Sequence, residues 1–221
     1  MKMKENPILD CFFGCFADVT TLYGPAASGK TNLCMLAALN ELEKGNKVIY
    51  VDMGNNFSIE RFKQMSDDYK KLLENIVFLK PKTFEEQFSV IEKLRVIDEK
   101  TSLVIVDTII GHYRLELDRT KEIYEINRKL GLQISHLKEI ANKNKIKVLI
   151  TSQVHDDSKE RTGVGVVGGN VIKYGSSCII ELETLNNNKR RAIIRKHPEI
   201  KEKEFIFEIK EKGFFPVEGV I

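Results

Sequence analysis

The sequence predicts an α/β fold in which a mostly parallel central sheet is flanked by helices. Two observations lead to this prediction. Short apolar runs of strand length alternate with helical patterns up to residue 153, as in chains that build parallel sheets. Beyond that point, strand-like runs follow one another without helical patterns between them, which predicts antiparallel strands at the C-terminal end.

The composition is that of a soluble globular protein and favours a single domain over residues 1–221. Hydrophobic residues make up 42% and charged residues 30% of the chain. The formal net charge of +3 permits a nucleic-acid partner without requiring one. No apolar run approaches the roughly 20 residues that span a bilayer, and no signal-peptide core follows the first residues. We therefore expect no membrane partner and a cytoplasmic location.

Local patterns predict the individual elements. The runs at 47–52 and 103–107 are continuously apolar, as strands buried on both faces are. Residues 83–86 form a capping box that opens a helix, the asparagine tract 186–188 favours a hairpin turn, and residues 1–16 form a short lead-in. The expected strands lie at 17–23, 47–52, 76–79, 103–107, 148–152, 178–182, 192–195, 205–209 and 214–217. The expected helices lie at 32–42, 58–74, 83–99 and 120–142.

A P-loop connects the first expected strand to the first expected helix. Residues 24–31 read Gly-Pro-Ala-Ala-Ser-Gly-Lys-Thr, which fits the full P-loop pattern in its usual setting. Its glycines let successive N–H groups point at phosphate oxygens, and the helix N-terminus adds partial positive charge. Lys30 is placed to reach the β- and γ-phosphates as a catalytic residue, and the Thr31 hydroxyl to bind Mg²⁺. The residues expected to bind the nucleotide are Gly24, Pro25, Ala26, Ala27, Ser28, Gly29, Lys30, Thr31 and Asn32.

Two further polar residues stand at the ends of expected strands. Asp107 ends the run 103–107, and its carboxylate is expected to hold Mg²⁺ or its water opposite Thr31. Gln153 follows the strand 148–152, where its amide can reach a γ-phosphate and act as a second catalytic residue. The alternatives are a carboxylate and an amide that only satisfy the local backbone.

Basic residues concentrate in two places near the C-terminal end. Residues 154–170 form an expected glycine-rich loop with both positive and negative charges, and loops of this length are often functional. The expected hairpin carries Lys189, Arg190 and Arg191. These side chains have three candidate partners: DNA phosphate, the triphosphate bound by a neighbouring subunit, or water alone.

Several segments in order resemble the RecA/RadA recombinase superfamily, and within it the archaeal RadB proteins. The most specific are Val106-Asp107 leading to Tyr113-Arg114, Ser152-Gln153-Val154 followed by Gly168-Gly169-Asn170, and Phe57-x-x-Glu60-Arg61. The resemblance implies a RecA-like P-loop ATPase core that binds ATP and DNA for homologous recombination. By position, residues 113–128 and 154–170 resemble the two DNA-facing loops, and Gln153 resembles the sensor of the γ-phosphate.

The chain departs from the recombinase pattern in two ways. RecA-like catalytic cores carry a glutamate two residues after the Asp52 position, and here that residue is Gly54, which has no group to polarise water. The chain also begins shortly before the P-loop, so no N-terminal helical DNA-binding domain or polymerisation segment is expected. RadB proteins resemble the chain in lacking that domain and are viewed as accessory proteins of recombination.

These features lead to a hypothesis of an ATP- and DNA-binding accessory protein of homologous recombination and DNA repair, with weak ATPase activity and no strand exchange of its own. The implied partners are DNA, a RadA-type recombinase and a junction-cleaving nuclease, and a dimer is expected rather than an extended filament. The alternatives are a KaiC-like signalling ATPase, a small-molecule P-loop kinase and an ATP-bound scaffold without enzymatic activity.

Overall fold

A nine-stranded sheet forms the centre of the computed structural model, which describes residues 13–119, 122–153, 169–186 and 188–217. The strand order is β3-β2-β4-β5-β1-β6-β7-β8-β9. The first five strands in the sequence are β1 (Val19–Gly24), β2 (Lys47–Asp52), β3 (Ile76–Leu79), β4 (Thr101–Asp107) and β5 (Lys147–Gln153). The remaining strands are β6 (Cys178–Thr184), β7 (Lys189–Lys196), β8 (Glu204–Lys210) and β9 (Gly213–Pro216).

The sheet is parallel from β3 to β6 and antiparallel from β6 to β9. The predicted fold class is therefore confirmed. β1 lies between β5 and β6, so the P-loop leaves the sheet from a central strand. Val19 to Gly24 of β1 are all buried, as expected for a central strand with helices over both faces.

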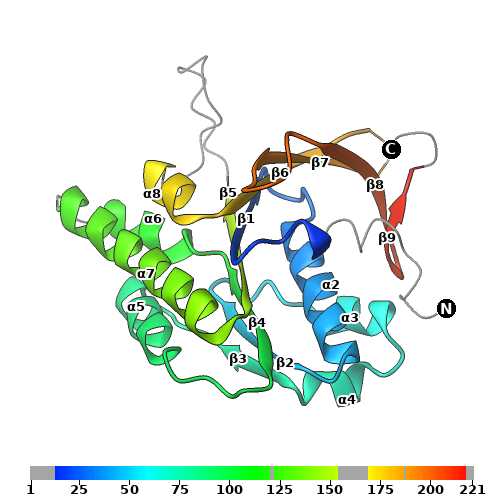
Figure 1. Cartoon of the computed structure of the whole chain (residues 1–221), viewed down its shortest axis with the longest axis horizontal. Helices are drawn as coiled ribbons and strands as arrows, with labels where there is room; N and C mark the ends of the chain where they lie inside the picture. Colours follow the sequence, from blue (N-terminus) through cyan, green and yellow to red (C-terminus); the bar gives the residue numbers. More distant parts are fainter. Residues whose placement is uncertain (1–12, 120–121, 154–168, 187, 218–221) are drawn as a thin grey trace.

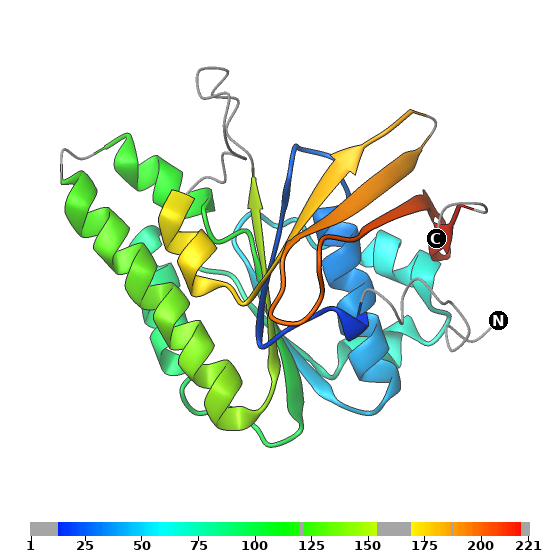
Figure 2. The same cartoon turned by 45° about the horizontal axis from the view of Figure 1, so that its top comes forward.

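Helices cover both faces of the parallel strands, as Figure 1 shows. On one side lie α2 (Lys30–Glu43), α3 (Ile59–Met65) and α4 (Tyr69–Leu73). On the other side lie α5 (Phe84–Lys93), α6 (Gly111–Leu117), α7 (Ile123–Asn144) and α8 (Gly169–Gly175). Figure 2 shows strands β6 to β9, in orange and red, curving toward the side on which α2 lies.

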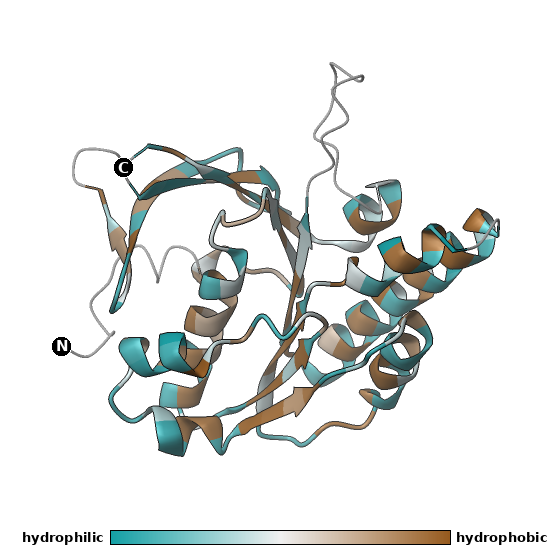
Figure 3. Cartoon of the chain, turned by 180° about the vertical axis from the view of Figure 1, so that it is seen from behind, coloured by the Kyte–Doolittle hydropathy of each residue, from teal (hydrophilic) through white to brown (hydrophobic). Residues whose placement is uncertain are grey.

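Two hydrophobic clusters fill the layers on either side of the sheet. The first joins α2 to the sheet and to the curved C-terminal strands, and includes Leu36, Ile180 and Phe207. The second joins α5, α6 and α7 to the opposite face, and includes Leu130 and Val104. Figure 3 shows the central strands mainly in brown, the colour of hydrophobic residues. Burial of these apolar side chains on both faces stabilises the sheet that carries the P-loop.

Four local differences separate the structure from the sequence prediction. The helix expected at 58–74 is split into α3 and α4, because Ser66, Asp67 and Asp68 between them favour caps and turns over helix interiors. The helix expected at 83–99 ends at Lys93, and Asp98 beyond it accepts a turn hydrogen bond from the Lys100 amide at 2.8 Å. The short helices α6 and α8 are not predicted at all; each begins at a glycine, and glycine is a poor helix former.

The capping box and part of the lead-in are observed. The Thr83 hydroxyl accepts from the Glu86 amide at 3.1 Å, whereas the Glu86 carboxylate accepts from the Lys82 amide rather than from Thr83. Phe13 and Phe16 pack on the first hydrophobic cluster, and the first twelve residues of the lead-in lie outside the described residues. In the described part of the chain, no helix combines the length and apolar character needed to cross a membrane.

Candidate nucleotide-binding site

The P-loop turns sharply between β1 and α2 at positions where only glycine fits. A Cβ atom on Gly24 would lie 2.1 Å from the carbonyl oxygen of Leu182, which is backbone and does not move aside easily. Gly29 caps α2 with a left-handed φ of 101°, and a Cβ atom there would lie 2.8 Å from the Ile209 side chain. The loop is therefore closely enclosed by β6 and β8, and its glycines are required by space as well as by backbone conformation.

Replacing Gly24 with alanine is expected to destabilise the protein by about 2–3 kcal/mol, because the added methyl group would overlap the Leu182 carbonyl and force backbone shifts. Urea denaturation followed by circular dichroism would measure the change. Gly14→Ala is the control, since nothing lies within 4 Å of a Cβ atom at that position. If the Gly24→Ala and Gly14→Ala variants are equally stable, the P-loop is not closely enclosed at Gly24.

The Lys30 ammonium is held inside the curl of the loop. It donates to the carbonyl oxygens of Gly24 at 2.9 Å and Pro25 at 2.7 Å, and to the Ser28 hydroxyl at 3.3 Å. Burial lowers the pKa of Lys30, although the nearby Asp107 carboxylate acts in the opposite direction. The side chain is thus a desolvated positive charge beside backbone N–H groups at a helix N-terminus, an arrangement suited to phosphate.

Asp107 lies at the end of β4, buried and fully engaged by three donors. The Thr31 hydroxyl donates to it at 2.8 Å, Thr151 at 2.6 Å and Tyr50 at 3.0 Å. Burial raises the pKa of Tyr50 well above its ordinary value, so the phenol remains a hydrogen-bond donor to the carboxylate. The structure brings Thr31 and Asp107 together, as the sequence analysis expects.

These two residues fit a bound Mg²⁺ of the P-loop type. Hydroxyl and carboxylate oxygens are the hard ligands that Mg²⁺ prefers, and Mg²⁺ usually keeps several waters and takes its remaining ligands from substrate phosphates. Only a few protein ligands are then needed. Separately, the described residues contain no group of three or more His, Cys, Asp or Glu side chains that could hold a metal ion.

The segment after β2 contains a carboxylate, but that carboxylate is occupied by the backbone. Asp52 is buried and accepts from the amides of Asn56 at 2.9 Å, Phe57 at 3.2 Å and Gly54 at 3.4 Å. It fixes the turn that leads to α3. Gly54 stands at the carboxyl end of β2, next to the end of β4, since Asp52 pairs with Asp107 in the sheet register. Gly54 has no side chain, and the carboxylate of Asp52 is bonded to backbone amides.

Gln153 ends β5 directly beside the P-loop. In the sheet register it pairs with Gly24, the first glycine of the loop. Its side-chain oxygen accepts from the guanidinium of Arg114 on α6 at 3.0 Å. Thr108 lies on the same stretch of surface and binds the Thr151 carbonyl at 2.8 Å. Gln153 therefore connects the P-loop edge of the sheet to α6.

The structure modifies the expected DNA-facing segments. The described part of residues 113–128 is mainly helical: Tyr113 to Leu117 belong to α6, and α7 begins at Ile123. The Tyr113 hydroxyl donates to the Asn127 side chain at 2.6 Å and so links α6 to α7. Of the segment 154–170, residues 154–168 lie outside the described residues, and Gly169 and Asn170 begin α8.

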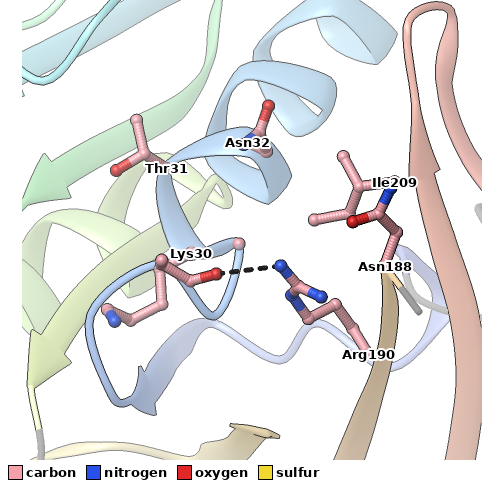
Figure 4. Close-up of a pocket in the computed structure, with 8 residues that line it drawn as sticks. Lys30, Thr31, Asn32, Asn188, Arg190 and Ile209 are labelled. Carbon is pink, nitrogen blue, oxygen red and sulfur yellow. Dashed lines mark hydrogen bonds between the residues drawn. The ribbon is translucent and has the colours of Figure 1, made fainter. Parts of the chain in front are cut away.

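The hairpin charges do not form a single patch. Arg191 is paired with Glu183 at 2.5 Å and Glu204 at 3.7 Å. Arg190 instead turns to the P-loop, where its guanidinium donates to the Ala27 carbonyl at 3.3 Å (Figure 4). Lys189 lies at the start of β7 beside the turn. Arg190 and Arg191, which are neighbours in the sequence, therefore have different surroundings.

Four residues at the site were not identified as functional from the sequence. Tyr50 and Thr151 complete the set of donors around Asp107, and Arg114 reaches Gln153. Arg61 ties α3 to the nucleotide side of the molecule, donating to the Asn32 side chain at 2.7 Å and to two carbonyl groups of the β8–β9 turn. Arg61 and Arg114 had a signal in the sequence, since each belongs to a pattern shared with recombinases. Tyr50 and Thr151 had none, because their contacts depend on strand register.

A P-loop on the central strand β1, in a mostly parallel sheet with antiparallel C-terminal strands, defines the protein as a P-loop protein of the RecA-like class. A family model described as Rad51 matches residues 9–216. The chain therefore belongs to the Rad51 family.

Comparison with individual proteins shows which members of the Rad51 family the chain resembles. The chain is 41% identical over 198 residues to a "DNA repair and recombination protein RadB" from Methanococcus maripaludis strain C7, covering 88% of this chain and 90% of the relative. It is 40% identical over 198 residues to the protein of the same name from Methanocaldococcus jannaschii, covering 88% and 91%. A solved structure, "Crystal structure of the RadB recombinase", matches with a TM-score of 0.81 and 33% identity over 99% of this chain and 100% of that chain. The resemblance to archaeal RadB proteins is confirmed.

Proposed function

We propose that this protein is an ATP- and DNA-binding accessory factor of homologous recombination and DNA repair that hydrolyses ATP slowly and performs no strand exchange itself. One observation supports this proposal best. The P-loop, Thr31 and Asp107 lie together as an ATP site would require, whereas position 54, where RecA-like ATPases carry a glutamate, is a glycine. The RadB relatives, named as DNA repair and recombination proteins, support the biological role. The proposed setting is the cytoplasm, with a RadA-type recombinase and a junction-cleaving nuclease as partners and a dimer as the assembled form.

In this proposal ATP binds through the P-loop backbone, with Lys30 on the β- and γ-phosphates. Thr31 and Asp107 would hold Mg²⁺, which when bound neutralises negative charge on the phosphates. Thr151 and Tyr50 keep the Asp107 carboxylate oriented toward Thr31. Slow hydrolysis follows because Asp52 is already bonded to three backbone amides and Gly54 has no side chain. No described residue at that position can take a proton from an attacking water.

ATP would then act mainly as a conformational ligand. Gln153 lies beside Gly24 and binds Arg114, and the candidate DNA segment 154–170 begins at the next residue. A γ-phosphate that attracts the amide of Gln153 would loosen its bond to Arg114 and reposition the start of that segment. Such a change can alter DNA affinity only if ATP interacts differently with the two arrangements. The Gln153 amide supplies that difference.

The test is DNA affinity with and without ATP, measured by fluorescence anisotropy for three proteins. For the unaltered chain we expect ATP to change the affinity by about fivefold or more, in the usual range of coupling between sites. Lys30→Ala should lose the ATP effect because it no longer binds ATP well. Gln153→Ala should still bind ATP, as measured separately by calorimetry, and yet lose the effect on DNA.

Three outcomes would count against the proposal. If the unaltered protein binds DNA equally well with and without ATP, ATP does not act as a conformational ligand that controls DNA affinity. No DNA binding at all, even at low salt where electrostatic binding is strongest, would favour a KaiC-like signalling ATPase instead. Transfer of phosphate to a small molecule rather than to water would identify a kinase.

A further inference from the structure

The pleat of β7 separates its arginines onto two faces. Side chains alternate along a strand, so Arg190 shares a face with Ala192 and Ile194, whereas Arg191 and Arg195 share the opposite face. Ala192 and Ile194 are buried in the cluster that contains α2. Arg190 is therefore directed to the side of the sheet on which the P-loop and α2 lie.

The arginines on the outer face are neutralised by glutamates. Arg195 pairs with Glu181 at 2.7 Å and Glu202 at 2.5 Å, and Arg191 pairs in the same way with two carboxylates. Arg190 is different. Among the described residues it has no carboxylate partner, and its only bonds are to the carbonyl oxygens of Lys189 at 2.9 Å and Ala27 at 3.3 Å. Arg190 is therefore the one arginine of β7 that has no carboxylate partner among the described residues.

This cation lines a cavity of about 370 Å³ together with the P-loop (Figure 4). Its lining includes Ala27, Gly29, Lys30 and Thr31 of the P-loop. The Nε atom of Arg190 is shielded from solvent and has no hydrogen-bond partner. An unsatisfied donor on a charged group is costly, so an acceptor in the cavity would be strongly favoured there.

We propose that Arg190 is a nucleotide-binding residue that contacts the phosphate chain of ATP in the same subunit. The inference rests on the proposed ATP site and adds to it a ligand from the β6–β7 hairpin. A guanidinium binds phosphate in a charge-assisted, two-pronged manner, which is stronger than its present bond of 3.3 Å to the neutral carbonyl of Ala27. Nucleotide would therefore draw Arg190 away from Ala27 and hold the hairpin against the P-loop.

In this arrangement Arg190 is turned to the P-loop: its guanidinium donates to the Ala27 carbonyl, and its Nε atom is shielded from solvent. We therefore assign it to the nucleotide and not to DNA. Charge on the hairpin would then be divided: Arg190 serves the nucleotide, and Arg191 serves the glutamates of β6 and β8.

The experiment is calorimetric binding of ATP with Mg²⁺, without DNA, to the full chain. We expect Arg190→Ala to weaken ATP binding about tenfold, the usual effect of losing a charged hydrogen bond. Arg190→Gln keeps a donor for Ala27 but removes the charge, and should show a similar loss; it carries the test if the alanine variant is unstable. Lys201→Ala, which removes a charge from the exposed β7–β8 connection, should bind ATP normally.

The outcomes separate this inference from the proposal on which it rests. If the unaltered protein binds ATP, and both Arg190 variants bind it with unchanged affinity, the role of Arg190 is refuted while the ATP site stands. If the unaltered protein fails to bind ATP, the proposed function itself is wrong. An equal loss in Lys201→Ala would show a general charge effect and would also overturn the role of Arg190.

Discussion

Introducing a glutamate at Gly54 is expected to raise the steady-state rate of ATP hydrolysis by on the order of 10²-fold, the lower end of what a general base contributes. Gly54 stands at the carboxyl end of β2, and its backbone does not adopt the left-handed conformation that excludes side chains. A Cβ atom there would approach only the side chain of Asn56, at 2.9 Å, which can rotate away. Release of phosphate with ATP in excess would measure the rate.

Gly54→Gln is the matched control for this gain. Glutamine has the same size and the same need to displace Asn56, but it cannot accept a proton from water at neutral pH. Its rate should stay near that of the unaltered protein. If Gly54→Glu folds, binds ATP normally and is no faster than Gly54→Gln, the missing carboxylate does not explain slow turnover.

The second large effect is expected at Lys30. Lys30→Ala should weaken ATP binding about 100-fold, because it removes a desolvated positive charge from the centre of the P-loop. The bonds from Lys30 to Gly24, Pro25 and Ser28 are lost as well, so the loop also loses part of its support. Titration calorimetry with ATP and Mg²⁺ measures the affinity.

Lys44→Ala supplies the comparison for Lys30→Ala. Lys44 caps the far end of the same helix α2, pairs with Glu41 at 2.6 Å and lies 55% exposed. Its removal should leave ATP binding unchanged. Thermal unfolding of both variants without nucleotide would separate loss of binding from loss of folding. ATP affinity that survives in a folded Lys30→Ala protein would contradict the assigned site.

Several parts of the fold and site could be predicted because they depend on local sequence. The parallel strands are short apolar runs, and the P-loop has a fixed spacing, so both were identified correctly. Asp107 was expected opposite Thr31 because it ends an apolar strand that follows a P-loop in the sequence, and the structure brings the two together although β5 lies between β4 and β1. The break between α3 and α4 also had a local signal in Ser66-Asp67-Asp68, although the apolar spacing on either side concealed it.

Other parts depend on contacts between distant segments. Tyr50 and Thr151 lie in predicted strands, but their bonds to Asp107 arise only when β2 and β5 take their places on either side of β4. Arg190 and Arg191 lie on opposite faces of β7 because successive side chains alternate along a strand, and this much could be predicted from the sequence. Their partners, however, come from β6, β8 and the P-loop. Charge clusters in sequence are therefore poor guides to charge patches on a strand.

In the proposed function this P-loop holds ATP as a ligand and hydrolyses it slowly. To test this, the protein is incubated with ATP and Mg²⁺, the complex is separated rapidly from free nucleotide, and the bound nucleotide is identified by chromatography. We expect most of the bound nucleotide to be intact ATP in the unaltered protein and ADP in Gly54→Glu. Bound nucleotide that is already mainly ADP in the unaltered protein would contradict it.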